Sequence, residues 1–170
     1  MAVERQRVMG VDTSLRSTGV GIVEAEGGRV RAIAHGTIPF PASARHSACL
    51  AGLYRAIQEW LAQTTPDAAA LEGVFFSRNL RTTLILGEAR GVVMAACAEA
   101  GIPVFEYAPR LVKQAVGGVG GADKRQVRRM VMAMLGLREE PREDAGDALA
   151  IALCHLHRCR GHAALLPQPI

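Results

Sequence analysis

A chain of 170 residues with 49% hydrophobic and 21% charged side chains has the composition of one globular domain of ordinary size, which excludes disorder. It can bury enough surface to fold without disulfides or a structural metal. The net charge of +4 suits a polyanionic partner without requiring one. We find neither an apolar run of the ~20 residues that cross a bilayer nor an apolar signal segment, so we expect a cytoplasmic protein with no membrane association.

The first part of the chain predicts three successive strands. An apolar run over residues 8–12 ends in Asp12, and a second run over 19–23 follows a short turn, as in a hairpin. A Gly-Gly turn at 27–28 leads into a third strand over 30–40, which two prolines close.

Helices and strands alternate along the rest of the chain. Apolar spacing predicts helices over 43–63, 83–100, 110–115, 122–135 and 143–157, and strands over 68–74 and 104–107. The glycine-rich residues 116–121 are predicted to be a mobile loop. We expect one α/β domain over residues 1–160, a mixed β-sheet flanked by helices, and a frayed C-terminal tail over 161–170.

The cysteines form no CxxC pair and are expected to act as small buried hydrophobes in a reducing compartment. Cys154, His155, His157, Cys159 and His162 use metal-ligand chemistry, but they fall at the end of one predicted helix. Ligands of tetrahedral zinc usually come from separate elements, so we expect no metal among them.

Four carboxylates lie where unpaired acids are costly. Asp12 ends the first strand, Glu72 lies near the end of the buried strand over 68–74, and Asp144 and Asp147 share one face of the last helix. If the two strand ends lie side by side under that helix, the four carboxylates converge. Such a cluster favours Mg²⁺ or Mn²⁺, and two such cations can activate a water and stabilise the leaving oxygen of a phosphodiester.

Each of these residues also has a local interpretation. Asp12 could cap a turn, Asp144 could cap the last helix, and Asp147 could pair with Arg142. Lys124 begins a helix after the glycine-rich segment, where it could reach a phosphate with help from the helix dipole, or simply belong to a solvated basic face.

Six blocks of the sequence resemble the RuvC family of Holliday-junction resolvases. They run in order from about residue 8 to about residue 157 and comprise GVD at 10–12, RSTGVG at 16–21, LEGVFF at 71–76, FEY at 105–107, VKQAVGG at 112–118 and DAGDALAIA at 144–152. Together the blocks are specific, whereas the first alone would be weak.

The resemblance implies a ribonuclease-H-like fold and a homodimer that makes paired symmetric nicks in four-way junction DNA during homologous recombination and repair. It also implies Mg²⁺ as cofactor, two ions in each active site, with Mn²⁺ as a possible substitute, and a branch-migration helicase complex as a possible partner. For the dimer interface we expect the helix over 83–100, whose apolar residues include Leu84, Leu86, Val92, Val93 and Ala96.

The resemblance also assigns roles to individual residues. The metal-binding acids of the family match Asp12, Glu72, Asp144 and Asp147. Basic residues near the scissile phosphate match Lys113 and Lys124, and residues that contact DNA match Phe75, Arg78 and Asn79. Core packing is the alternative for both Phe75 and Phe76, and we expect it for Phe76; an exposed Phe75 would instead stack on a base or hold the crossover open.

The chain departs from the family pattern at two places. Thr13 and Ser14 follow Asp12 where the family commonly has Pro-Gly, and Gly73 replaces a more usual glutamine. These changes leave the carboxylates intact and affect the local turn and any sequence preference that depends on it.

Two other functions remain open. A non-catalytic nucleic-acid-binding module could share the fold, although it would not need all four acids. The Asp-hydroxyl turn before a glycine-rich hairpin also resembles the phosphate loop of actin-like ATPases and sugar kinases, but 170 residues leave no room for their second lobe.

Overall fold

The computed structural model describes residues 5–73, 79–118, 121–160 and 167–170. Strands and helices follow one another in the order β1 (Gln6–Asp12), β2 (Ser17–Glu26), β3 (Arg29–Pro39), α1 (His46–Thr64), β4 (Ala68–Glu72), α2 (Leu80–Glu99), β5 (Val104–Tyr107), α3 (Pro109–Gly117), α4 (Lys124–Leu135) and α5 (Glu143–Arg160).

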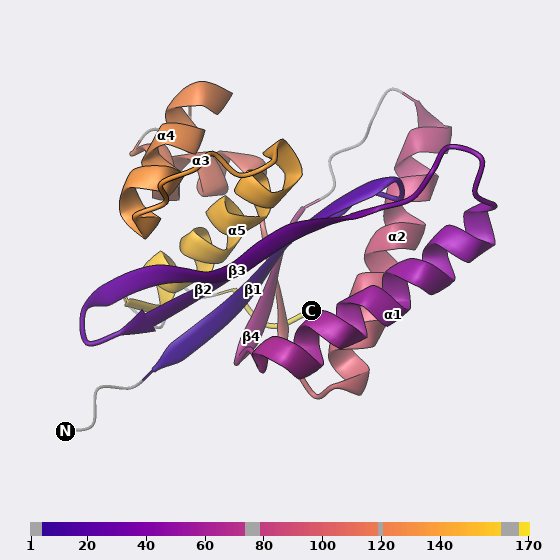
Figure 1. Ribbon diagram of the computed structural model, residues 1–170, viewed down its shortest axis with the longest axis horizontal. Helices are drawn as coiled ribbons and strands as arrows, with labels where there is room; N and C mark the ends of the chain where they lie inside the picture. Colours follow the sequence, from indigo (N-terminus) through magenta and orange to yellow (C-terminus); the bar gives the residue numbers. More distant parts are fainter. Residues whose placement is uncertain (1–4, 74–78, 119–120, 161–166) are drawn as a thin grey trace.

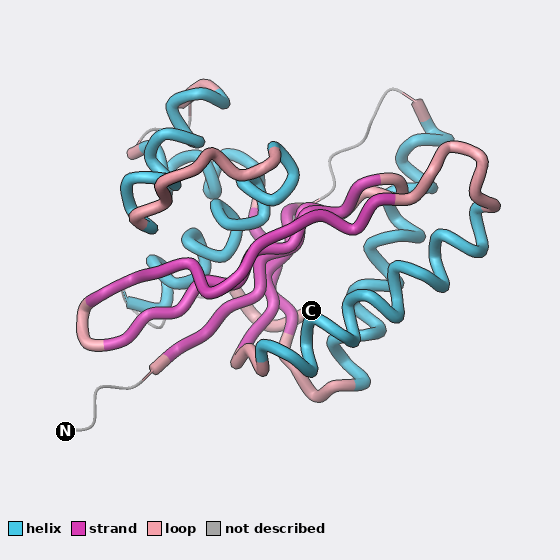
Figure 2. Tube along the Cα trace, viewed as in Figure 1, coloured by secondary structure: helices cyan, strands magenta, loops and turns pink. Residues whose placement is uncertain are grey.

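The strands form one mixed sheet in the order β3-β2-β1-β4-β5. The β1–β2 and β2–β3 pairs are antiparallel, whereas β4 pairs in parallel with both β1 and β5. Helices α1 and α2 cover one face of the sheet, and α3, α4 and α5 lie on the other (Figure 1). Figure 2 shows the same layers, with the helices separated by the central strands. The predicted α/β class is confirmed.

Alternation of side chains along the strands divides the apolar residues into two cores. On β1, Met9 and Val11 pack with α1 and α2, whereas Val8 faces α5. On β4, Leu71 belongs to the first core and Ala70 to the second. This alternation decides which layer each polar residue at a strand end meets.

Glycines on β1 and β2 let α5 lie directly on the sheet. A Cβ atom at Gly10 would come within 1.9 Å of the carbonyl oxygen of Ala148, and one at Gly19 within 1.9 Å of that of Asp144. A Cβ at Gly21 would lie 2.8 Å from Leu149 atoms. We call these three glycines the glycine seam. Only glycine fits at such distances, so the seam fixes how closely α5 approaches the strands.

Several element boundaries differ from prediction. Helix α2 begins earlier than residue 83 because the Asn79 side chain accepts hydrogen bonds from the backbone N–H groups of Arg81 and Thr82, at 3.0 and 3.3 Å, and so caps the helix. The predicted loop over 116–121 was wrong at its start, since α3 continues to Gly117 and is capped by Gly118, whose φ is 76°. Strand β4 ends at Glu72.

The interface predicted on α2 needs correction. Val93 and Ala96 are fully buried against the protein's own sheet and α1, so they are not available to a partner. Leu86 and Val92 are half-buried, whereas Leu84 is 67% exposed and Leu80, which was not predicted, is 75% exposed. The error arose because α2 carries apolar residues on both faces, and periodicity alone does not tell which face is inside.

Cysteine and histidine side chains near the end of α5 make contacts within the fold. Cys154 and His155 are buried, and the Nδ1 atom of His155 lies 2.8 Å from the hydroxyl of Tyr107. Cys159 accepts a hydrogen bond from Gln6 at 3.3 Å. His162 lies outside the described residues.

The C-terminus returns to the sheet. The backbone N–H of Ile170 donates to the carbonyl oxygen of Val104 at 2.9 Å, so the last residue has a defined contact. Within the described ranges, none of the helices combines the length and apolar character that a membrane span requires.

Candidate functional site

Two of the predicted acids come together at the carboxyl ends of β1 and β4. The parallel register pairs Val11 with Leu71, so the next residues, Asp12 and Glu72, follow on neighbouring strands. By alternation both side chains belong to the face covered by α5, since Gly10 meets that helix. The strand order therefore places two carboxylates beside each other under the α5 layer.

Helix α5 supplies a third carboxylate to the same place. Asp147, one helical turn into α5, lines a cavity of about 340 Å³ together with Asp12 and Glu72. Asp144, a turn earlier, lies close enough for its charge to act on Asp12. Three of the four predicted acids thus line one cavity, and Asp144 lies near it without lining it.

Two lysines from separate helices line the same cavity. Lys113 comes from α3 and Lys124 from the first residue of α4. The Nζ atom of Lys124 lies 2.7 Å from Glu143 Oε1 and 3.8 Å from Asp147 Oδ2. The hydrogen bond to Glu143, with the charge of Asp147, raises the pKa of Lys124, so the residue stays cationic.

The carboxylates repel one another. Burial, followed by the charges of Asp147, Glu72 and Asp144, raises the pKa of Asp12 to about 7, and Lys124 opposes that rise. Burial and the charge of Asp147 likewise raise the pKa of Glu72, while Lys113 and Lys124 lower it. Like charges held in one cleft in this way bind positive charge favourably.

A second cavity of about 330 Å³ also borders Asp12 and Glu72. Its walls include Thr13 and Gly73, the two places where the sequence departs from the family pattern. Arg90 of α2 also lines it and donates from Nη1 to the backbone oxygen of Glu72 at 2.8 Å. The arginine therefore holds the end of β4 from the side opposite α5.

The donor set fits a hard divalent cation by its chemistry. The acids in the cleft offer only carboxylate oxygens, which Mg²⁺ and Mn²⁺ prefer, and burial, together with the neighbouring carboxylates, raises the pKa of Asp12. Over the described ranges, however, no three His, Cys, Asp or Glu side chains are gathered closely enough to hold a metal ion. The ligands are thus on the right elements but are not drawn into a closed set.

The remaining predicted site residues divide into two groups. Asn79 is described, and its side chain caps α2 at an exposed position. Phe75, Phe76 and Arg78 lie outside the described residues. The sequence also suggested Arg142 as a partner for Asp147, but in the structure Asp147 forms its ion pair with Lys124.

Sequence reasoning missed three residues around the site. Ser17 donates a hydrogen bond to Asp144, Glu143 binds Lys124, and Arg90 holds the carbonyl of Glu72. Glu143 had a signal, because acids favour the first turn of a helix and it adjoins Asp144. The role of Arg90 depends on how α2 packs, which no local pattern predicts.

Comparison with known proteins gives a family match over most of the chain. The family model described as crossover junction endodeoxyribonuclease RuvC matches residues 8–155. The chain is 47% identical over 155 residues to a protein of that name from Syntrophomonas wolfei, covering 91% of this chain and 90% of the relative.

A solved structure is similar as well. Thermus thermophilus RuvC in complex with Holliday junction substrate aligns with a TM-score of 0.87 and 32% identity, covering 97% of this chain and all of that one. The predicted ribonuclease-H-like fold is confirmed by this agreement.

Proposed function

The chain belongs to the RuvC family, and we propose that it is a crossover junction endodeoxyribonuclease that resolves four-way DNA junctions by paired symmetric nicks. The observation that carries the proposal is the cleft in which Asp12, Glu72 and Asp147 meet beside Lys113 and Lys124. Acids from two strands and a helix, with lysines at the rim, suit hydrolysis of a phosphodiester. We place this activity in homologous recombination and DNA repair.

We propose Mg²⁺ as the cofactor, two ions in each active site, with Mn²⁺ able to substitute. Asp12, Glu72, Asp144 and Asp147 would hold the ions. Divalent cations at such sites activate water and offset the negative charge that develops on the leaving oxygen.

The lysines act on the DNA backbone. Lys124 is two-thirds exposed at the start of α4, so its ammonium group can move from Glu143 to a phosphate oxygen without uncovering a buried partner. There it would stabilise charge that grows in the transition state. Lys113, half-buried on α3, would neutralise a phosphate near Glu72, whose pKa it already lowers.

Residues that follow Glu72 in sequence are proposed to read the junction. Phe75 would stack on an unpaired base or keep the crossover open, and Arg78 and Asn79 would bind the backbone. Asn79 marks the exposed start of α2, close in sequence to the acidic strand end.

A homodimer follows from the symmetry of the proposed reaction, since two nicks related by symmetry require two active sites. We place the interface on the exposed apolar side of α2, at Leu80 and Leu84. Sedimentation should give twice the mass of 18.1 kDa. A branch-migration helicase complex is a further proposed partner, and the cytoplasm the proposed location.

The experiment compares a labelled four-way junction with a linear duplex of the same arm sequence, each with and without Mg²⁺, and measures ATP hydrolysis in parallel. We expect symmetric nicks in the junction alone, dependent on Mg²⁺ and absent from Asp147→Asn. Junction binding without cleavage would favour the non-catalytic module. ATP hydrolysis without cleavage would favour a phosphate-loop ATPase.

A further inference from the structure

Ser17, the first residue of β2, makes a direct contact with one of the acids. Its Oγ–H donates a hydrogen bond to Oδ2 of Asp144, which lies more than a hundred residues later in the chain. A hydroxyl that donates to a carboxylate makes a charge-assisted bond, stronger than a bond between two neutral groups. The contact joins the start of β2 to the first turn of α5.

The backbone on both sides of this contact is fixed. Gly19, two residues after Ser17, belongs to the glycine seam and touches the backbone of Asp144, so Ser17 and Gly19 present the same face of the strand to α5. Thr18 between them is fully buried; its hydroxyl donates to the carbonyl oxygen of Ser14 and accepts the Ser14 N–H at 3.2 Å. Ser17 is therefore held in place by the fold and does not depend on its own hydrogen bond for its position.

We propose that Ser17 is a positioning residue, which fixes the carboxylate of Asp144 so that it can bind the catalytic cation. The proposal rests on the proposed function. By engaging one carboxylate oxygen, the hydroxyl restricts rotation of the side chain and leaves the other oxygen for a ligand bond. Because serine is neutral, it orients the acid without cancelling its charge, unlike the ion pair of Lys124 with Asp147. Partners of this kind typically change metal affinity 10- to 100-fold.

A matched pair of variants tests the proposal. Ser17→Thr keeps the hydroxyl, and Ser17→Val has the same shape without it; both β-branched residues suit a strand. We expect Ser17→Val to bind Mn²⁺ about 10-fold more weakly than Ser17→Thr, measured by electron paramagnetic resonance in the absence of DNA. The Mg²⁺ concentration for half-maximal junction cleavage should rise by about the same factor, with little change in the rate at saturating Mg²⁺.

Controls separate this contact from general effects on the fold. Thr37→Val makes the same hydroxyl deletion on β3 and should leave Mn²⁺ binding unchanged. Ser17→Ala supplies a second deletion if the valine variant melts early. Equal Mn²⁺ affinity in the threonine, valine and alanine variants would overturn the role of Ser17 while the nuclease proposal stands. A wild-type protein that neither binds Mn²⁺ nor cuts junctions would overturn both.

Discussion

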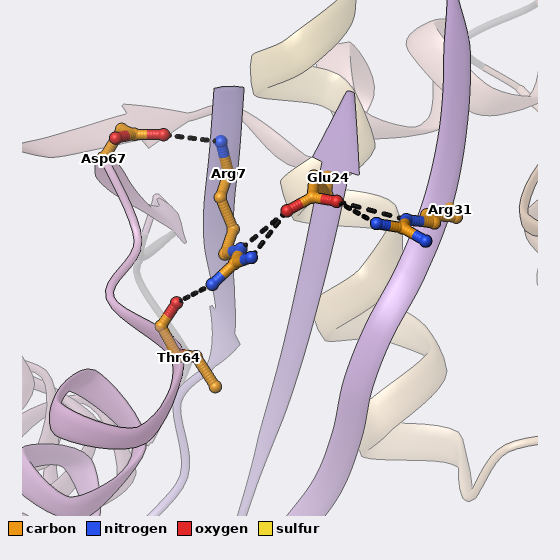
Figure 3. Close-up of polar contacts among 5 residues, drawn as sticks. All are labelled: Arg7, Glu24, Arg31, Thr64 and Asp67. Carbon is orange, nitrogen blue, oxygen red and sulfur yellow. Dashed lines mark hydrogen bonds and ion pairs between the residues drawn. The ribbon is translucent and has the colours of Figure 1, made fainter. Parts of the chain in front are cut away.

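The two ends of the sheet hold carboxylates in opposite circumstances. Glu24, near the end of β2, is 1% exposed and faces Arg7 of β1 and Arg31 of β3 across the strands. Arg7 donates to one oxygen at 3.0 and 2.6 Å, and Arg31 to the other at 3.1 and 2.6 Å (Figure 3). Asp12, at the opposite end of β1, is surrounded instead by other acids.

The pKa values of the two acids move in opposite directions. Hydrogen bonds from Arg31 and then Arg7 lower the pKa of Glu24, whereas burial and neighbouring carboxylates raise that of Asp12 to about 7. A carboxylate whose charge is fully paired contributes to the fold. Carboxylates that lie together without enough positive charge lower the stability of the fold. Such a cluster is typical of a site that binds a ligand.

We call the end of the sheet at Asp12 the crowded end and the end at Glu24 the paired end. The largest expected effect comes from a substitution at the crowded end. Asp147→Asn should slow junction cleavage about 1000-fold or more, because the loss of a proposed metal ligand would forfeit several kcal/mol of transition-state stabilisation. Its free energy of unfolding should stay the same or rise, since one repelling charge is gone, and junction binding should survive. Single-turnover cleavage, a binding titration and urea unfolding on one preparation measure all three. Cleavage near the wild-type rate would remove Asp147 from the site.

The paired end should respond in the opposite way. Glu24→Gln is expected to lower the free energy of unfolding by about 3 kcal/mol, because Arg7 is left mostly buried without its charge partner. Junction cleavage by the folded protein should remain within about 2-fold of wild type, since the proposed active site lies at the other end of the sheet. Urea unfolding and cleavage well below the melting temperature check both. A comparable loss of cleavage would show that the two ends are coupled.

Substitution of Lys124 tests whether a cation at the crowded end also stabilises the fold. Lys124→Ala should reduce cleavage about 30-fold and junction affinity less than about 3-fold, because the proposed phosphate contact would be a small share of binding but would act on the developing charge. Because its ion pairs are exposed, the substitution should hardly change the free energy of unfolding. Arg125→Ala, at the next position of α4, is the matched control. Equal losses of cleavage and affinity would make Lys124 a binding residue only.

Low pH should abolish the contribution of Glu24 to the free energy of unfolding. Because the folded pKa of Glu24 is lowered from 4.5, its contribution to stability is complete above pH 4.5 and is lost as the pH falls through the folded value. The gap in unfolding free energy between wild type and Glu24→Gln should therefore shrink below pH 4.5, by up to about 1.4 kcal/mol per pH unit. Urea unfolding across that range measures it. Glu59→Gln, exposed on α1, is the matched control.

The crowded end could be predicted from the sequence because its residues carry local signals. Asp12 and Glu72 terminate apolar runs, and the i, i+3 spacing puts Asp144 and Asp147 on one helical face. The paired end could not be predicted in the same way. Glu24 lies 17 residues from Arg7 and 7 from Arg31, and only the strand register brings the three together.

The same reason explains the other omissions. The contact of Ser17 with Asp144 depends on how α5 crosses β2, and the inward face of α2 depends on where α1 packs. The order and type of elements follow from periodicity, whereas contacts between distant elements require the assembled fold.

The glycine seam determines which parts of the site can open. Helix α5 carries Asp144 and Asp147 in its first turns and fully buried residues such as Leu149 and Leu153 further along, so it cannot lift from the sheet without exposing the core. Amide hydrogens of α5 and β1 should therefore exchange with solvent only through global unfolding, while those of α3 and α4 exchange through smaller openings. The acids would then keep fixed positions on the sheet and α5, and any adjustment to DNA would come from the helices that bear Lys113 and Lys124.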